Sequence, residues 1–369
     1  MDLRPADRAE LAGMLRAATA DGRVLDIRGG GLHARRGRPF AADDVLHTAG
    51  LARVVDYVPE DMTITVEGGV SVGEVLRLAG ERGQGWPQAP SQPADTAATV
   101  GGVLAAAAGG RRRLRFGPIR DSLLEVVVAT GDGRIVKGGG RTVKSVTGYD
   151  LPRLLTGSLG TLGVIVQATL RLWPLPMAEQ WFSAQGTTDE MLDLAQGVLA
   201  DLHRPTAVIA GPASLHVCLT GVPDDVVAPA GMVDSVEPHW PRADTTGAET
   251  AGAGTGTVAA GAVEAGVPPA ALPALARQLA ADGFEYEAWM GTGICRVAVW
   301  APDHVLAVRE LAMAHRGHAQ VIDGDDALRT DPFGPVPAGA DIMRRIRASF
   351  DPAGILCPGC FAAAEAVPA

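Results

Sequence analysis

The sequence predicts an α+β fold divided into two domains, residues 1–176 and 177–369. In both halves, stretches with the apolar spacing of a helix alternate with short runs rich in β-branched residues. A β-type run over 163–173 stops at Trp173-Pro174-Leu175-Pro176, and a proline-rich stop of this kind favours a domain boundary. The chain has 369 residues, which is more than one hydrophobic core usually serves.

The first domain is predicted to begin with a helix and to continue with strands separated by glycine-rich turns. Apolar residues from Leu11 to Ala18 share one helical face, which predicts a helix within 5–19. Ser71 and Glu74 have the spacing of a capping box, so a second helix is expected to begin there. Runs rich in β-formers predict strands over 23–28, 63–66, 123–129, 134–137 and 163–173, with Gly131-Asp132-Gly133 as the turn of a hairpin between the third and fourth.

The second domain alternates helices and strands. Helical spacing predicts helices over 188–202 and 268–282, and β-type runs predict strands over 207–210, 214–219 and 293–300. Residues 224–257 contain mostly Ala, Gly, Thr, Pro and acidic residues. Because so few large apolar side chains do not offset the entropy cost of ordering the backbone, we expect most of this segment to be a mobile loop.

Composition and charge exclude several classes of protein. The formal net charge of −10 disfavours a general nucleic-acid binder, which needs a basic surface. No run approaches the roughly 20 apolar residues of a membrane span, and the mixed charges of Met1–Glu10 are not typical of a secretory signal. The four cysteines are too few for a disulfide framework in a chain of this size. We therefore expect a soluble, cytoplasmic protein.

A run of three glycines in the first domain indicates a ligand close to the backbone. Gly29-Gly30-Gly31 follows a predicted strand, and with Ala34 it satisfies the pattern G-x-G-x-x-A. A Rossmann site would need a helix to begin here, yet His33–Pro39 contains three arginines and ends in proline, which is typical of a loop. Consecutive glycine amides in a loop can still form a nest for phosphate. The alternative is a plain tight turn.

A second segment, Asp95–Ala108, combines small hydroxyl residues, a glycine pair and a run of alanines. Gly101 and Gly102 allow phosphate or ribitol oxygens to approach the backbone, and Thr96 and Thr99 can donate hydrogen bonds. The alanines favour a tightly packed helix. The alternative is a small-residue helix that only packs on a sheet.

The third segment, Gly148–Ile165, has the longest pattern, G-Y-D-L-x-x-L-x-x-G-S-x-G-T-L-G-V-I. Together with R-G-G-G and T-x-G-G upstream, in this order over about 150 residues, it resembles the PCMH-type FAD-binding domain of the vanillyl-alcohol-oxidase-like flavoproteins, as found in D-lactate dehydrogenases and bacterial glycolate oxidase. More narrowly, several segments resemble the smaller FAD-binding subunit of glycolate oxidase: Arg112–Gly117, Arg120-Asp121, Lys144, Phe350–Leu356 and Pro358-Gly359.

The resemblance implies a PCMH-type FAD-binding domain of two subdomains, followed by a smaller α+β domain of the FAD-linked oxidase type. It implies that two sets of residues wrap the pyrophosphate and ribitol of FAD: Gly29, Gly30, Gly31, Leu32 and His33, and Asp95, Thr96, Thr99, Gly101 and Gly102. The adenine half would be contacted through backbone atoms by Gly160, Gly163, Val164 and Ile165. In several relatives a histidine directly after the glycine run is bonded to the flavin. Leu32 stands at that place and His33 one place later, so we expect FAD to be held non-covalently.

The densest basic run of this acidic chain comprises Arg111, Arg112, Arg113, Arg115 and Arg120. One interpretation is a solvated face. The others are charge complementarity to the flavin phosphates and docking of an acidic partner subunit.

No catalytic residue and no metal ligand can be assigned from the sequence. Hydride transfer from a 2-hydroxy acid needs a proton acceptor, a cation for the carboxylate and contact with the flavin. Relatives that oxidise such acids often carry H-x-G-D-G-N-x-H, which this chain lacks. The nearest stretch is His315-Arg316-Gly317-His318, which makes His318 the only candidate base, and a surface or structural histidine is the favoured interpretation.

The four cysteines fall into two groups. Cys357 and Cys360 have the C-x-x-C spacing of metal knuckles and redox pairs. A zinc site with His315 and His318, a redox-active pair and two ordinary thiols in a terminal turn are the alternatives, and the last is favoured. Cys218 and Cys295 lie in strand-like apolar settings and are expected in the core.

The leading hypothesis is an FAD-binding oxidoreductase subunit of a glycolate-oxidase-like complex, which passes electrons from a 2-hydroxy acid through flavin to an iron–sulfur partner. The resemblance implies a larger FAD subunit and an iron–sulfur subunit as partners, with at most peripheral membrane association. Two alternatives stay open: a stand-alone flavin-dependent 2-hydroxy-acid or alcohol dehydrogenase, and a non-catalytic flavin-bound structural subunit.

Overall fold

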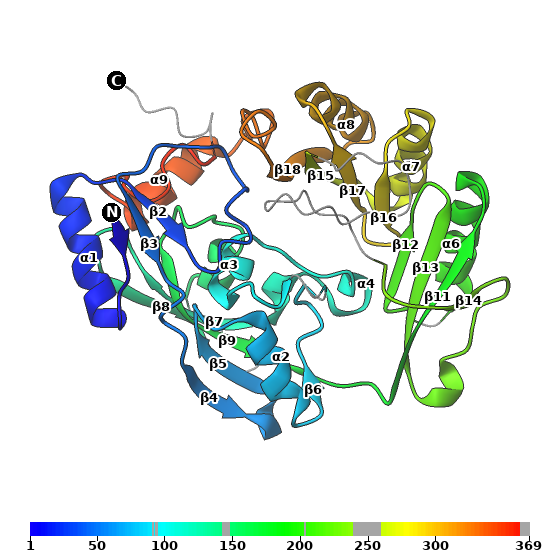
Figure 1. Ribbon diagram of the computed structural model, residues 1–369, viewed down its shortest axis with the longest axis horizontal. Helices are drawn as coiled ribbons and strands as arrows, with labels where there is room; N and C mark the ends of the chain where they lie inside the picture. Colours follow the sequence, from blue (N-terminus) through cyan, green and yellow to red (C-terminus); the bar gives the residue numbers. More distant parts are fainter. Residues whose placement is uncertain (91, 93–94, 142–147, 203, 239–259, 362–369) are drawn as a thin grey trace. The chain divides into compact units, whose positions relative to one another are not determined.

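A computed structural model describes residues 1–90, 92, 95–141, 148–202, 204–238 and 260–361 (Figure 1). The chain forms two compact units, and each is built from segments that are distant in the sequence. Unit 1 comprises Met1–Gly110, Pro118–Leu175 and Pro335–Ala369, and unit 2 comprises Arg111–Gly117 and Pro176–Gly334. A single division after residue 176 would place Arg111–Gly117 in the first domain and Pro335–Ala369 in the second. In the structure, Arg111–Gly117 belongs to unit 2 and Pro335–Ala369 belongs to unit 1.

Unit 1 contains an antiparallel sheet in the order β4-β5-β9-β7-β8, a parallel sheet in the order β1-β3-β2 and the ribbon β10-β6. Its α-helices are α1 (Arg8–Asp21), α2 (Val72–Gly80), α3 (Val100–Ala105), α5 (Leu151–Leu155) and α9 (Ala340–Phe350). Its strands are β1 (Asp2–Leu3), β2 (Leu25–Arg28), β3 (Asp44–His47), β4 (Val54–Val58), β5 (Thr63–Glu67), β6 (Gln84–Gly85), β7 (Leu123–Ala129), β8 (Ile135–Gly139), β9 (Val164–Arg171) and β10 (Trp173–Pro174).

Unit 2 is an antiparallel sheet in the order β14-β11-β13-β12-β16-β17-β15-β18, with α6, α7 and α8 packed against one face (Figure 1). Its strands are β11 (Ala178–Gln185), β12 (Ala207–Ala210), β13 (Ser214–Gly221), β14 (Val233–Ser235), β15 (Gly261–Gly266), β16 (Tyr286–Trp289), β17 (Ile294–Val299) and β18 (His318–Gly324). Its α-helices are α4 (Arg113–Phe116), α6 (Thr188–Asp201), α7 (Leu272–Ala281) and α8 (Pro302–Ala314).

The predicted α+β class is confirmed, and so are most of the predicted elements. The backbone N–H of Glu74 donates to the Ser71 hydroxyl over 3.1 Å, so α2 begins where the capping pattern places it. The strands β7 and β8 form the predicted hairpin. The prediction of a loop over 224–257 is wrong for Val233–Ser235, which form β14 because their backbone pairs with β11. Residues 239–257 lie outside the described part of the chain.

Strand β9 is buried on both faces, which explains its nearly continuous apolar sequence. Val164 and Val166 pack with α1, β2 and β3, whereas Ile165, Ala168 and Leu170 pack with α2 and α3 on the other face. The loop that enters β9 is therefore fixed by two hydrophobic clusters.

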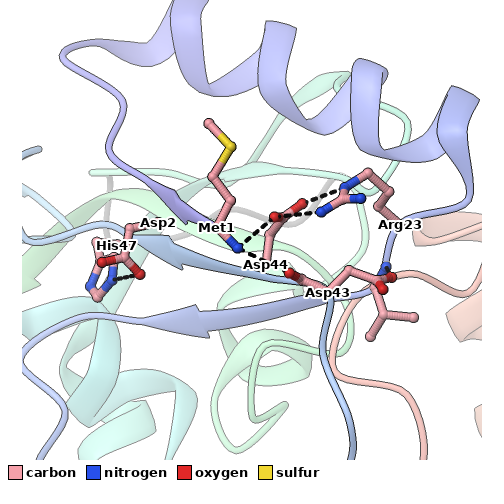
Figure 2. A network of polar contacts seen from close by, with 7 residues as sticks. Met1, Asp2, Arg23, Asp43, Asp44 and His47 are labelled. Carbon is pink, nitrogen blue, oxygen red and sulfur yellow. Dashed lines mark hydrogen bonds and ion pairs between the residues drawn. The ribbon is translucent and has the colours of Figure 1, made fainter.

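Asp44 anchors the parallel sheet through ion pairs (Figure 2). Its carboxylate accepts two hydrogen bonds of 2.7 Å from Arg23 and lies 3.0 Å from the amino group of Met1. The hydrogen bond from Arg23 and the bond from the amino group hold the pKa of Asp44 well below its usual value. This sheet presents the end of β2, where the glycine run begins.

No helix in the described part of the chain has the length and apolar character needed to cross a bilayer.

Candidate functional site

Three chain segments that are far apart in the sequence surround one pocket in unit 1. They are the loop after β2, the first turns of α3 and the loop that enters β9, and a turn near the C-terminus completes the wall. The predicted site residues that line the pocket are Gly29, Gly30, Gly31, Leu32, His33, Gly101, Gly102, Gly160, Gly163, Val164 and Ile165. The structure therefore brings together members of all three glycine-rich segments.

The glycine run after β2 packs directly on the segment before α3. A Cβ on Gly29 would lie 2.1 Å from the Thr99 hydroxyl oxygen, and one on Gly30 would lie 2.8 Å from the Ala97 carbonyl oxygen. Within the described residues, the amides of Gly30, Gly31 and Leu32 donate no hydrogen bond. Three consecutive amides that are not used by the fold form a nest suited to an anion.

The glycine pair of α3 uses both of its amides within the protein. The amide of Gly101 donates to the Gly68 carbonyl oxygen (2.8 Å), and that of Gly102 donates to the Thr99 hydroxyl (3.3 Å). These two amides are thus engaged within the protein. A Cβ on Gly101 would lie 3.0 Å from the Gly68 carbonyl oxygen, so this glycine is needed for close packing within the protein. A Cβ on Gly102 would have only the Thr99 hydroxyl oxygen within 4 Å, at 3.0 Å.

The loop before β9 requires glycine for conformational reasons. Gly160 and Gly163 have φ values of +80° and +139°, and a Cβ on Gly163 would lie 2.6 Å from the Ala129 carbonyl oxygen. This turn directs Val164 and Ile165 into β9 at the pocket edge.

Asp95, Thr96 and Thr99 do not line the pocket. Thr99 is the N-cap of α3, the Thr96 carbonyl oxygen accepts from the Gly73 amide (2.9 Å), and Asp95 is buried. Direct contact of these residues with a ligand stays a prediction.

Sequence reasoning missed several residues of the wall. Arg36 lines the pocket and its guanidinium donates to the Ala106 carbonyl oxygen, which ties the glycine loop to the end of α3. Cys357 and Cys360 also line it. The arginines after the glycine run were a visible signal, whereas the cysteines are more than 300 residues away in the sequence.

Comparison with known proteins identifies the ligand class. Residues 1–139 match the family model of the FAD binding domain. The first part of the chain is an FAD binding domain. The PCMH-type FAD-binding domain predicted from the motifs is therefore confirmed, and FAD is its cofactor.

Relatives of known name match about half of the chain. The chain is 36% identical over 174 residues to D-lactate dehydrogenase of Archaeoglobus fulgidus, covering 47% of this chain and 38% of that protein. It is 34% identical over 179 residues to glycolate oxidase subunit GlcE of Escherichia coli, covering 48% of this chain and 50% of that protein. The chain thus spans half the length of these relatives or less.

The fold extends beyond the shared sequence. A solved structure of an alkyldihydroxyacetonephosphate synthase superposes with a TM-score of 0.62 at 14% identity, over 96% of this chain and 75% of that one. At this identity the likeness shows the fold alone.

The pocket fits FAD on structural grounds. The dinucleotide carries a diphosphate, and the unused amides of Gly30, Gly31 and Leu32 can donate to its oxygens. Gly102 lines the pocket and has only the Thr99 hydroxyl oxygen within 4 Å of an added Cβ, so its missing side chain leaves room for a ligand.

The arginine run lies outside this pocket. Arg111 is buried and its guanidinium lies 2.7 Å from Glu287, and Arg112 pairs with Glu179. Both arginines also face Glu237, at 3.6 and 3.5 Å. All of these residues belong to unit 2, so the interpretation as a solvated face is wrong for Arg111 and Arg112. Their charges are balanced by carboxylates of the same unit.

The sheet face of unit 2 opposite α6, α7 and α8 carries an apolar cluster of its own, formed by Trp181, Ile209, Cys218 and Trp289. A signal for this face is present in β13, where Leu, Val and Leu alternate with Ser, His and Cys.

His216 of β13 is a candidate proton acceptor that sequence reasoning missed. Burial, the largest influence, and the nearby Arg111 lower its pKa, against an opposing effect of Glu287. Its imidazole is therefore neutral at neutral pH, and Nδ1 has no hydrogen-bond partner among the described residues. His318, the base considered from sequence, is exposed. His315 contacts Gln278 over 3.0 Å.

The zinc interpretation of the C-x-x-C pair finds no support in the structure. Across the described ranges, no group of three or more His, Cys, Asp or Glu side chains could hold a metal ion. Cys218 and Cys295 are buried, as predicted for core residues.

Proposed function

We propose that this chain is an FAD-dependent oxidoreductase subunit that acts on 2-hydroxy acids within a glycolate-oxidase-like complex. The observation that carries the proposal is the meeting of the three glycine-rich segments around one pocket of the FAD binding domain. The named relatives support the substrate class, since they include a D-lactate dehydrogenase, glycolate oxidase subunits and a D-2-hydroxyglutarate dehydrogenase.

In this proposal, Gly29–His33 and Gly101–Gly102 hold the diphosphate and ribitol, and Gly160–Ile165 hold the adenine half. FAD would be held non-covalently and would supply a two-electron acceptor for the hydride of the substrate. The residues of this chain bind and orient it: the amides of the glycine loop fix the anion, and the loop before β9 fixes the edge of the pocket. The partners are a larger FAD subunit and an iron–sulfur subunit that relays electrons.

Flavin retention tests the site. Gly102→Val adds a side chain at the pocket wall. Among the described residues, only the Thr99 hydroxyl oxygen lies within 4 Å of the added Cβ, at 3.0 Å. We expect this variant to purify without yellow colour. Gly80→Val, at the end of α2 with no atom within 4 Å of an added Cβ, should stay yellow. Retained colour in Gly102→Val would refute the site, and acid precipitation that leaves the colour in the pellet would refute non-covalent attachment.

Flavin reduction tests the reaction. Glycolate, D-lactate and D-2-hydroxyglutarate are mixed in turn with the purified chain, alone and with a copurified iron–sulfur partner. Loss of visible flavin absorption only in the presence of the partner supports the subunit role. Absence of reduction under all conditions would leave a flavin-bound structural subunit and refute the proposal.

A stand-alone dehydrogenase is the second candidate, and the similarity to D-lactate dehydrogenase of Archaeoglobus fulgidus favours it. Reduction of the flavin by D-lactate in the purified chain without a partner protein supports this candidate. Reduction only in the presence of the partner contradicts it.

A further inference from the structure

The chain after α9 returns to β2 and forms one side of the FAD pocket. The Leu25 amide donates to the Ile355 carbonyl oxygen (2.8 Å), and the Cys357 amide donates to the Leu25 carbonyl oxygen (3.1 Å). The Arg38 amide donates to the Cys360 carbonyl oxygen (2.9 Å). Residues 355–360, here called the C-terminal turn, are therefore bonded to the chain both before and after the glycine loop.

The C-terminal turn is held in place by Asp351. Its two carboxylate oxygens accept from the amides of Ile355 (3.1 Å) and Leu356 (2.9 Å). Arg347 of α9 donates to the Leu356 carbonyl oxygen (3.0 Å). These hydrogen bonds fix the conformation of the C-terminal turn at the pocket wall.

The C-terminal turn contributes two thiols to the pocket wall, each packed against a glycine of a pocket loop. A Cβ on Gly37 would lie 2.3 Å from the Cys360 sulfur, and a Cβ on Gly160 would lie 3.4 Å from the Cys357 sulfur. Both cysteines line the pocket together with Ile27 and Leu159. Both cysteines are almost fully buried.

The Cys357 thiol is a neutral, polarizable group. Burial is the main cause that raises the pKa of Cys357 to about 12, so it carries no charge at neutral pH. A buried thiol of this kind is a poor nucleophile and a poor metal ligand, since both roles need the thiolate. A neutral sulfur packs well against an aromatic ring instead.

We propose that Cys357 and Cys360 are FAD-binding residues whose thiols pack against one aromatic ring system of the dinucleotide. The nest formed by Gly30, Gly31 and Leu32 fixes the diphosphate. FAD has an aromatic ring system on either side of its diphosphate, so one of the two would lie against the wall formed by Ile27, Leu159 and the two thiols. This inference rests on the proposed placement of FAD in the pocket.

Titration of the cofactor-free full chain tests the proposal with three probes: FAD, ADP and FMN. Cys357→Ala with Cys360→Ala should weaken FAD binding roughly three- to tenfold, the range that lost sulfur–aromatic contacts predict. A parallel loss for ADP with unchanged FMN affinity places the adenine against the thiols, and the reverse places the isoalloxazine there. Unchanged affinity for all three overturns the proposal.

A second variant covers the case in which the double substitution fails to fold. Gly37→Ala pushes a Cβ into the Cys360 sulfur, at a residue whose φ is +75°. It should weaken FAD binding in the wild-type chain and cost less when Cys360 is already alanine. Equal losses in both backgrounds would show that the thiol does not transmit the clash and would overturn the proposal.

Two controls separate this inference from the proposed function. Cys295→Ala removes a thiol of similar burial from the core of unit 2 and should leave all three affinities unchanged. If Gly102→Val abolishes FAD binding while the cysteine variants bind normally, only the role of the thiols fails. If Gly102→Val also binds FAD normally, the pocket assignment fails with it.

Discussion

Gly68 packs directly against the backbone of Ile165. A Cβ on this residue would lie 2.1 Å from the Ile165 carbonyl oxygen, at the end of β5 where β9 enters the sheet. Backbone cannot rotate away as a side chain can, so Gly68→Ala should lower the free energy of unfolding by about 1–3 kcal/mol, the usual cost of overpacking. Urea unfolding followed by circular dichroism measures this.

The matched control is Gly13, in the interior of α1. No atom lies within 4 Å of a Cβ added there. Gly13→Ala should raise the free energy of unfolding by roughly 0.5–1 kcal/mol, because alanine restricts the unfolded chain and favours the helix. If both alanine variants change stability by the same amount, the explanation from close backbone contact is wrong.

The ion pairs of Asp44 predict how acid changes the stability of the parallel sheet. Its pKa in the folded state is lowered by Arg23 and the amino group of Met1, so the folded protein favours the ionised form. The stabilisation is therefore complete above the ordinary pKa of an aspartate and is lost as pH falls below it. Asp44→Asn should lower the melting temperature at pH 7 and flatten its dependence on pH below about 4.

Asp61→Asn, at an exposed position, is the reference for that measurement. It should leave the melting temperature at neutral pH nearly unchanged. A melting temperature that falls equally with acid in Asp44→Asn and in the wild type would contradict the assigned role of Asp44.

At the scale of elements, helices and strands with a local signal were predictable. Helix α2 follows from the spacing of Ser71 and Glu74, and the β7–β8 hairpin from its glycine turn. The pairing of distant segments was not predictable, because periodicity shows which face of an element is apolar and not what covers it. Arg111 pairs with Glu287, 176 residues later.

The candidate site also contains residues that the sequence predicts and residues that it does not. Its glycine-rich segments were predictable because a close approach of backbone atoms requires glycine. Arg36 and the C-terminal turn were missed because their place in the wall depends on bonds to Ala106 and Leu25, which no local pattern encodes.

The segment Arg111–Gly117 should be essential to unit 2 through one buried ion pair. Arg111 and Glu287 are 5% and 8% exposed, so Arg111→Met leaves a buried carboxylate without its main partner. We expect a loss of about 3–5 kcal/mol in the free energy of unfolding. Arg111→Met combined with Glu287→Met should recover most of it.

Arg277→Met is the surface counterpart within the same unit. Arg277 pairs with Asp189 over 2.6 Å, but both side chains are well exposed, so its loss should cost less than about 1 kcal/mol. Similar losses for Arg111→Met and Arg277→Met would mean that burial does not control the strength of these pairs.

At the scale of the whole molecule, the two units have separate hydrophobic cores, and the proposed FAD pocket lies in unit 1. A ligand stabilises the part of a protein whose folding creates its site. FAD at 100 times its dissociation constant should therefore raise the stability of unit 1 by about 2.7 kcal/mol and leave unit 2 unchanged. Scanning calorimetry should show two transitions, of which FAD moves one and Arg111→Met lowers the other. A single transition, or an equal shift of both with FAD, would show that the units unfold together despite their separate cores.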